Sequence, residues 1–362
     1  MSIDALRAPV PGAVATAVNR GHVYYGGIQD LRGWAALLVV LYHAHVLFQK
    51  EKYFGFQVFG GFFEFGHRGV DLFFVISGFL MAMLTHEPEQ KSRAWEFLLA
   101  RARRIYVPFV PVMLGLTGGC LVFANACPAA YSFDTSTVLA NLLIVPRENL
   151  DTFVPVVAWT LAHELFFYLM TFASLLLGRL GAMLLGLWLA ASGAVMLAGM
   201  QLPFPWSFIL SPYNIAFGLG FLAFKINRWR GVKIPARASL AVGACAFLAL
   251  GAVEAFSGVP AGKAASTALM LGFFVSSFFL VLGFLGQPTR WVRPLGNASY
   301  SIYLVHYPLL VVLCMLLRFR SGEIALHLQY LALVAITLAC AGAYYMLMER
   351  PALRLVGRRD GA

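Results

Sequence analysis

A few polar residues inside long apolar runs are the ones that could carry chemistry in this sequence. Arg32 and His43 stand eleven positions apart in LRGWAALLVVLYHAHVLF (residues 31–48). Eleven residues turn a helix through about three full turns, so both side chains share one face, about 16 Å apart along the axis. His45 is turned by about 200° from His43. We therefore expect an elongated ligand to reach from Arg32 to His43, and His45 to take no part.

Two other segments place titratable groups near the middle of their apolar runs. WTLAHELFFY (residues 159–168) contains Glu164 with Tyr168 one turn later, and NASYSIYLVHYP (residues 297–308) contains His306. A carboxylate at such a depth needs a cation or a hydrogen-bond donor beside it. An imidazolium would serve, so the sequence predicts that these groups lie in one layer of the molecule.

Asp71 and Ser77 lie in FGHRGVDLFFVISGF (residues 65–79). Asp71 falls near His43 in depth and competes with Glu164 as the carboxylate that orients an imidazole. Ser77 could form a covalent intermediate, but no base is visibly paired with it. We expect Ser77 to be a small residue that allows close helix packing.

A basic cluster, RARRIYVP (residues 101–108), precedes the third apolar run. Arg101, Arg103 and Arg104 fall at the same level as Arg32. The planar fork of arginine binds phosphate through two parallel hydrogen bonds, and the start of a helix adds a favourable dipole for an anion. The cluster predicts a phosphate site, although arginines here could also serve only to fix the topology.

Composition decides which architecture must position these residues. Hydrophobic residues make up 60% of the chain, charged residues 12%, and the mean hydropathy is +0.77. A bilayer core of about 30 Å needs roughly 20 apolar residues per helix. The sequence therefore predicts an all-α, polytopic bundle of about ten transmembrane helices. The expected spans are 31–48, 68–86, 105–126, 154–177, 180–199, 205–224, 236–256, 264–286, 296–317 and 326–348.

Lysine and arginine are distributed unevenly between the two ends of these helices. Most fall on the side of the N-terminus, which the positive-inside rule assigns to the cytoplasm, so both termini are expected there. The net charge of +11 is explained by this topology and by attraction to anionic lipids, without nucleic acid. Residues 1–27 are expected to form a disordered cytoplasmic tail and residues 352–362 a basic one. The cysteines show no metal-ligand spacing, and no metal site is expected.

Six segments, in order along the chain, resemble those of the acyltransferase-3 family of integral membrane O-acyltransferases. The sequence is most similar to the exopolysaccharide O-acetyltransferase branch of that family. The segments are DLRGWAALLVVLYH (30–43), FGHRGVDLFFVISGF (65–79), RRIYVP (103–108), WTLAHELFFY (159–168), LGNASYSIYLVHYP (295–308) and Glu-Arg-Pro (349–351).

The resemblance implies a transmembrane domain over residues 28–351 that moves an acyl group, usually acetyl, from cytoplasmic acyl-CoA to a hydroxyl group of a cell-surface or exopolysaccharide glycan. It implies a multi-pass protein of the bacterial plasma membrane, with acetyl-CoA as donor substrate and no permanently bound cofactor. A glycan or lipid-linked saccharide would be the acceptor, and polysaccharide-assembly proteins would be potential partners. It makes Arg32 and His43 essential and places Glu164 and His306 in the core.

The resemblance and the spacing together lead to one mechanistic hypothesis. The pantetheine arm reaches upward from the bound CoA phosphates and brings the thioester near His43. Neutral His43 then removes the proton of the acceptor hydroxyl, and the alkoxide attacks the thioester directly. An acyl-histidine or an acyl-Ser77 intermediate is the less favoured route. The arginines expected to hold the CoA phosphates are Arg32, Arg101, Arg103 and Arg104.

A secondary transporter or flippase for a lipid-linked sugar is the alternative interpretation, because ten helices with buried charges suit it as well. Many transporters are built from two related halves. The pattern formed by Arg32 and His43 has no counterpart in residues 180–348. The absence of an evident second half therefore favours the enzyme.

Overall fold

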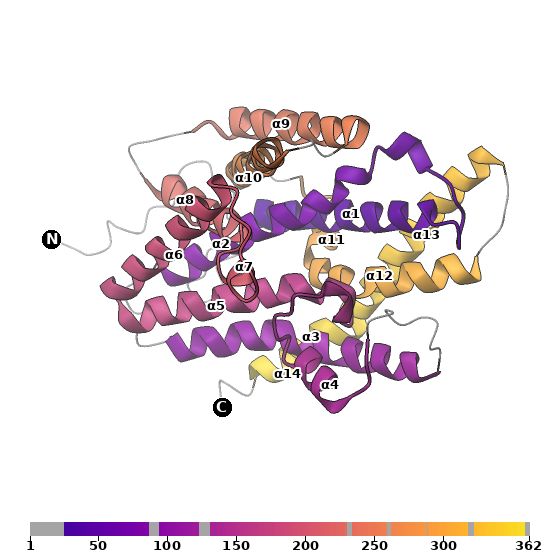
Figure 1. Cartoon of the computed structure of the whole chain (residues 1–362), viewed down its shortest axis with the longest axis horizontal. Helices are drawn as coiled ribbons and strands as arrows, with labels where there is room; N and C mark the ends of the chain where they lie inside the picture. Colours follow the sequence, from indigo (N-terminus) through magenta and orange to yellow (C-terminus); the bar gives the residue numbers. More distant parts are fainter. Residues whose placement is uncertain are drawn as a thin grey trace.

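Long helices account for most of the chain (Figure 1). The computed structural model describes residues 25–86, 94–122, 131–229, 234–258, 262–287, 289–317 and 322–358. In these ranges there are helices and loops without a strand, and ten helical stretches are long and apolar enough to cross a membrane. The predicted all-α bundle of ten spans is therefore confirmed. The long helices are α1 (Gly26–Gln49), α2 (Gly69–Thr85), α3 (Ala94–Val122), α5 (Trp159–Leu177), α6 (Arg179–Leu197), α8 (Tyr213–Arg228), α9 (Ala236–Ser257), α10 (Lys263–Gly286), α12 (Ser299–Leu316) and α13 (Glu323–Tyr344).

Short helices complete the connections between these spans. A π-helical turn, η8 (Tyr345–Glu349), joins α13 to α14, so the tenth stretch runs on to Val356 instead of ending near 348. The first 24 residues, most of the predicted tail 1–27, lie outside the described residues, as do the last four of the predicted tail 352–362, whose earlier residues belong to α14. The other short elements are η2 (Val58–Gly61), η3 (Glu64–Arg68), α4 (Thr135–Leu142), η6 (Leu150–Thr152), η7 (Val156–Ala158), α7 (Trp206–Ile209), α11 (Arg293–Asn297) and α14 (Arg350–Arg358).

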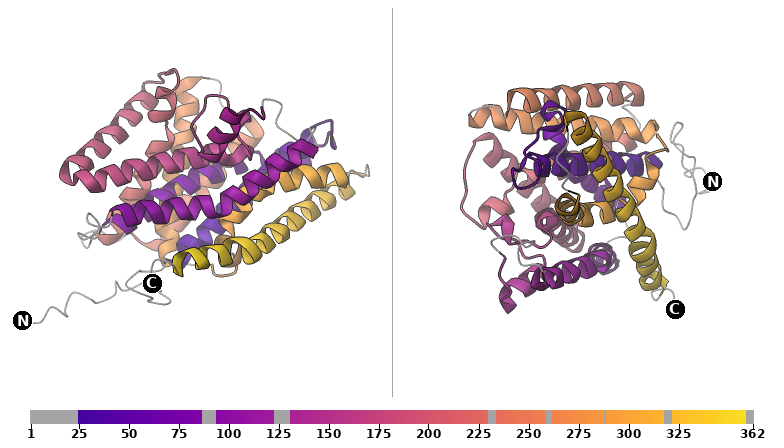
Figure 2. Two further views of the ribbon diagram at one scale, coloured as in Figure 1. Left: turned by 90° about the horizontal axis from the view of Figure 1, so that it is seen from below. Right: turned by 90° about the vertical axis from the view of Figure 1, so that its right-hand side faces the viewer.

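Helix α1 runs through the interior of the bundle (Figure 2). It packs against α2, α10, α11, α12 and α13, while α9 lies at one edge of the molecule and α3 at the opposite edge (Figure 1). Leu31, Ala35 and Val39 are buried along its length. A helix that is apolar on most sides is buried on most sides. The polar residues of α1 are therefore held among other helices.

Helices α2 and α8 approach each other closely at two glycines. A Cβ atom on Gly78 would overlap the carbonyl oxygen of Phe217, and one on Gly220 would overlap that of Val75. Small residues allow such backbone contact between membrane helices. The contact fixes the position of Ser77, the neighbour of Gly78.

Helix α3 begins at Ala94, well before the predicted span of 105–126. Arg101, Arg103 and Arg104 therefore lie about two to three turns inside the helix. The expectation that the dipole at a helix start would assist anion binding by these arginines is wrong, because that effect fades within the first turn. The apolar run of the sequence begins only after the arginines, whereas the helix includes them.

Candidate active site

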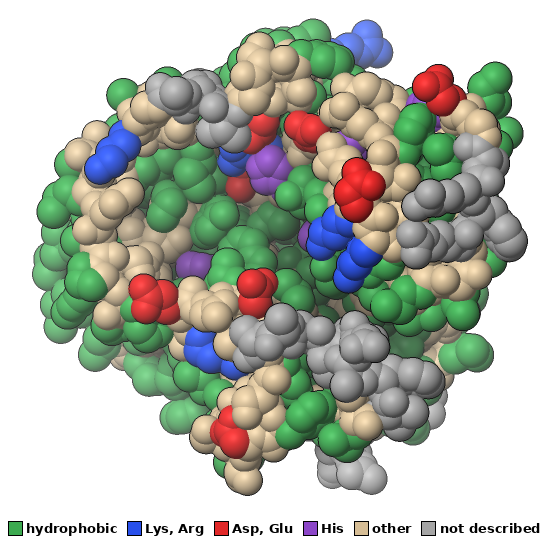
Figure 3. Space-filling model, turned by 45° about the vertical axis from the view of Figure 1, so that its right-hand side comes forward, with side chains coloured by type: hydrophobic (Ala, Val, Ile, Leu, Met, Phe, Trp, Pro, Cys, Tyr) green, Lys and Arg blue, Asp and Glu red, His purple; other side chains and the backbone are tan. Residues whose placement is uncertain are grey.

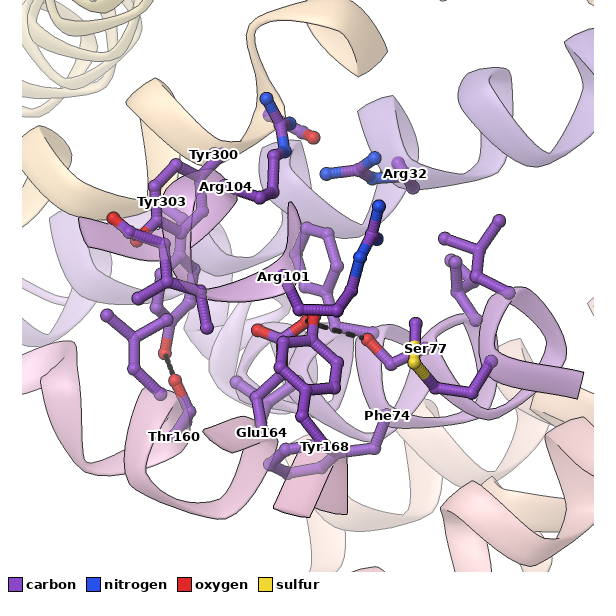
Figure 4. A pocket seen from close by; sticks show the side chains of 18 residues that line it. Arg32, Phe74, Ser77, Arg101, Arg104, Thr160, Glu164, Tyr168, Tyr300 and Tyr303 are labelled. Carbon is purple, nitrogen blue, oxygen red and sulfur yellow. Dashed lines mark hydrogen bonds between the residues drawn. The ribbon is translucent and has the colours of Figure 1, made fainter. Parts of the chain in front are cut away.

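A pocket brings together four of the residues predicted from the sequence: Arg32 from α1, Arg101 and Arg104 from α3, and Glu164 from α5 (Figure 4). Hydroxyl groups from α2, α5 and α12 complete its polar lining. Arg103, one residue before Arg104 and turned by about 100° around α3, does not line the pocket. The hydroxyl-bearing residues are Ser77, Thr160, Tyr168, Ser299, Tyr300 and Tyr303.

The carboxylate of Glu164 is held by hydroxyl groups. Ser77 Oγ donates a hydrogen bond to Glu164 Oε1 at 3.1 Å, and the hydroxyl of Tyr168 donates to the same oxygen (Figure 4). The expected imidazole partner is therefore replaced by these two donors. Ser77, in turn, does have a carboxylate beside it, which the sequence did not reveal because the two residues are on different helices.

Arg104 is anchored by a residue for which sequence reasoning assigned no role. Its Nη1 lies 2.6 Å from Oε1 of Glu349, which is fully buried, and the guanidinium group sits 5.5 Å from the centre of the Tyr300 ring. The other carboxylate oxygen of Glu349 accepts a hydrogen bond from Ser301. A carboxylate directly at the end of an apolar run was the available signal, since such a group needs a partner when it is buried.

His43 and His306 form a pair just beyond the pocket. Nδ1 of His43 lies 3.1 Å from Nε2 of His306, and the two ring centres are 4.9 Å apart. Nδ1 of His306 faces two carbonyl oxygens, those of Ile302 at 2.9 Å and Tyr303 at 2.8 Å. Nδ1 of His43 also faces the carbonyl oxygen of Val39 at 3.0 Å.

These contacts define where the protons of the neutral pair lie. A carbonyl oxygen only accepts hydrogen bonds, so Nδ1 of His306 must carry its proton, and Nε2 is left as an acceptor. Nδ1 of His43 must then donate to that acceptor and to the carbonyl of Val39. The free lone pair of His43 is consequently on Nε2, where an imidazole can act as a base.

Tyr303 contacts both the pocket and the histidine pair. It lines the pocket, its hydroxyl lies 2.7 Å from the hydroxyl of Thr160, and it donates to the carbonyl oxygen of Val157 at 3.2 Å. Its ring centre is 5.8 Å from that of His306 and 5.9 Å from that of Phe73. Tyr303 thus connects the lining of the pocket with His306, the partner of His43.

Comparison with known proteins identifies the family of this chain. The sequence profile described as an acyltransferase domain matches residues 26–346, which is most of the chain. The chain belongs to the acyltransferase-3 family. It is an acyltransferase and a multi-pass membrane protein.

Two characterised relatives cover nearly the whole acyltransferase. The exopolysaccharide production protein ExoZ of Rhizobium meliloti (strain 1021) is 32% identical over 318 residues, which span 82% of this chain and 92% of that protein. The acyltransferase MdmB of Streptomyces mycarofaciens is 25% identical over 377 residues, or 92% of each chain. No solved structure is significantly similar to this acyltransferase.

Asp71 of the acyltransferase has an arginine as its partner. Its Oδ2 lies 3.4 Å from Nη1 of Arg68, whose Nε and Nη2 donate to the two carboxylate oxygens of Glu254 at 2.9 and 2.8 Å. His67 lies 3.5 Å from the same glutamate. The expectation that Asp71 would orient an imidazole beside His43 is therefore replaced by a separate ion cluster that joins η3, α2 and α9.

The end of the acyltransferase at which α1 terminates is hollowed (Figure 3). Histidine, acidic and basic side chains gather around an apolar floor in this view. His43 is half-buried, and the ring of its neighbour Tyr42 lies 5.1 Å from that of His67, whose side chain is 38% exposed. The histidine pair therefore lies toward this end, and the arginine-lined pocket toward the other.

Proposed function

We propose that this acyltransferase transfers an acetyl group from acetyl-CoA to a hydroxyl group of a cell-surface or exopolysaccharide glycan. The donor is proposed to bind at the arginine-lined pocket, because arginine forks match phosphate groups. The relative ExoZ, named for exopolysaccharide production, supports a glycan as acceptor. The proposed chemistry rests on Nε2 of His43, whose lone pair is free to accept a proton.

The proposed reaction is a direct acyl transfer. Nε2 of His43 takes the proton of the acceptor hydroxyl as that oxygen forms a bond to the thioester carbonyl carbon. The carbon–sulfur bond then breaks, and the departing CoA thiolate receives the proton from the imidazolium. His306 acts as a positioning residue that holds Nδ1 of His43, whereas Glu164 acts among the donor-binding residues.

We infer that both termini face the cytoplasm of a bacterium and that the hollowed end faces outward. The positive-inside rule supports this orientation. A second observation agrees with it: Cys120, near the end of α3 that lies on the hollowed side, is disulfide-bonded. Disulfides persist in oxidising compartments outside the cytoplasm. Residues 28–351 would then form the catalytic domain in the plasma membrane.

Labelled acetyl-CoA, supplied to membrane vesicles that contain the protein, tests the proposal. We expect label to enter glycan with the wild type, and His43→Ala to lower transfer by at least about a hundredfold, the scale of general base catalysis. His86→Ala is the control, because His86 is exposed and lies at the far end of α2. Undiminished transfer by His43→Ala would overturn the base assignment. Saturable sugar movement without use of acetyl-CoA would instead indicate the transporter.

A further inference from the structure

A second hollow adjoins the arginine-lined pocket at the start of α1. Arg104 lines both, so a ligand in the hollow lies next to the pocket. Three of the seven lining residues are arginines, and none is acidic among the residues that the structure describes. The lining consists of Gln29, Arg104, Asn297, Tyr345, Arg350, Leu353 and Arg354.

The charges around this hollow are unbalanced. Arg350 and Arg354 are four residues apart on α14, where like charges repel and destabilise a helix. In the described part of the chain no carboxylate pairs with either of them. Glu349 binds one N–H group of Arg104, and its other oxygen is taken by Ser301. A bound anion would relieve this repulsion.

We propose that the hollow binds the phosphorylated nucleotide end of the acyl donor, with Arg350 and Arg354 holding its phosphate groups. This inference rests on the proposed donor and extends it to Arg350, in the Glu-Arg-Pro segment, and to Arg354, in the predicted basic tail. Arg104 stands where the pantetheine arm would enter the first pocket. The ring of Tyr345 offers the flat surface on which a purine base stacks.

The phosphate of an anionic lipid headgroup presents the same chemistry to these arginines. The two sources differ in their location, since a lipid reaches α14 from the bilayer surface and a nucleotide from water. They also differ in the base, which the lipid lacks. Binding experiments in bilayers of defined composition therefore separate them.

The test is binding of adenosine 3′,5′-bisphosphate and of CoA to the full-length protein in nanodiscs made only of phosphatidylcholine. We expect Arg350→Gln and Arg354→Gln each to weaken binding by about 10- to 100-fold, the value of a hydrogen bond to a charged group. Arg354→Lys should recover part of the loss, because it keeps the charge without the fork. Arg179→Gln, an exposed arginine at the start of α6, is the matched control.

A second comparison uses 3′-dephospho-CoA. The wild type should bind it more weakly than CoA, and the arginine variants should no longer distinguish the two. Equal binding of CoA by the wild type and both variants would overturn the inference while leaving the proposed donor intact. Failure of the wild type to bind CoA at all would instead overturn the donor. If the variants bind nucleotide as tightly as the wild type but associate more weakly with phosphatidylglycerol, the site binds a lipid headgroup instead.

Discussion

Nδ1 of His43 and Nε2 of His306 lie 3.1 Å apart, so His306 accepts the proton that His43 carries on Nδ1. Two backbone carbonyl groups accept the proton of Nδ1 of His306. Nε2 of His43 remains available to accept a proton. A base that must accept a proton at one nitrogen gains from a neighbour that holds the other. We therefore expect His306 to act by positioning His43.

Substitution of His306 tests this positioning role. His306→Leu removes one acceptor of the His43 Nδ1 proton and leaves the carbonyl of Val39, so the imidazole is oriented less firmly and kcat should fall by at least about tenfold. His306→Gln should recover part of that loss, because a side-chain carbonyl can accept the same hydrogen bond. KM for acetyl-CoA should stay unchanged in both. Steady-state kinetics measure this, and equal kcat values for the Leu and Gln variants would contradict it.

Ser77 provides a test of direct transfer against an acyl-serine route. If the hydroxyl of the acceptor attacks the thioester directly, Ser77→Ala should retain kcat within about tenfold, since only one hydrogen bond to Glu164 is lost. Intact mass spectrometry after incubation with acetyl-CoA alone should detect no acetylated enzyme. Accumulation of an acetyl group on the wild type, absent from Ser77→Ala, would establish the acyl-serine route instead.

The ion pair of Arg104 and Glu349 should contribute to stability as well as to binding. Arg104→Gln leaves the fully buried Glu349 without its cation, which costs about 3–5 kcal/mol. The double substitution Arg104→Gln with Glu349→Gln removes both charges and should recover most of the lost Tm. Thermal unfolding in detergent measures both variants. If the double variant has no higher Tm than Arg104→Gln, the loss of stability does not come from the unpaired charge of Glu349.

The close approach of α2 and α8 predicts that Gly78 tolerates no side chain. Gly78→Ala places a methyl group against the carbonyl of Phe217 and should destabilise the protein by about 1–3 kcal/mol. Gly115→Ala is the matched control, because no atom lies within 4 Å of its added Cβ and alanine favours a helix. Thermal unfolding of the two variants measures the difference, and equal Tm values would contradict the packing argument.

The spans could be predicted because apolar length alone determines them. The positions of Arg32, Arg101, Arg104 and Glu164 along their helices likewise indicated compatible depths. Depth does not determine which way a helix faces. The partner that Glu164 finds on another helix therefore came from α2, and that of His43 from α12, through rotations that only packing fixes. The early start of α3 was missed for a related reason, since hydropathy falls at arginines that the folded helix accommodates.

The role of Glu349 was also beyond reach of the sequence. Its carboxylate meets Arg104 from a helix 245 positions away along the chain. Spacing along one helix carries no information about such a contact. The short segment Glu-Arg-Pro could only be noted as part of a resemblance.

The ring of Tyr303 has a consequence for the cell as a whole. An enzyme that takes its donor from one side of a membrane and serves an acceptor on the other must not become a leak for protons and ions. With its hydroxyl bonded to Thr160 and Val157, Tyr303 lines the charged pocket and lies next to His306. For the transfer proposed above, we expect this side chain to close the path that protons and ions would otherwise follow between the two sides of the membrane.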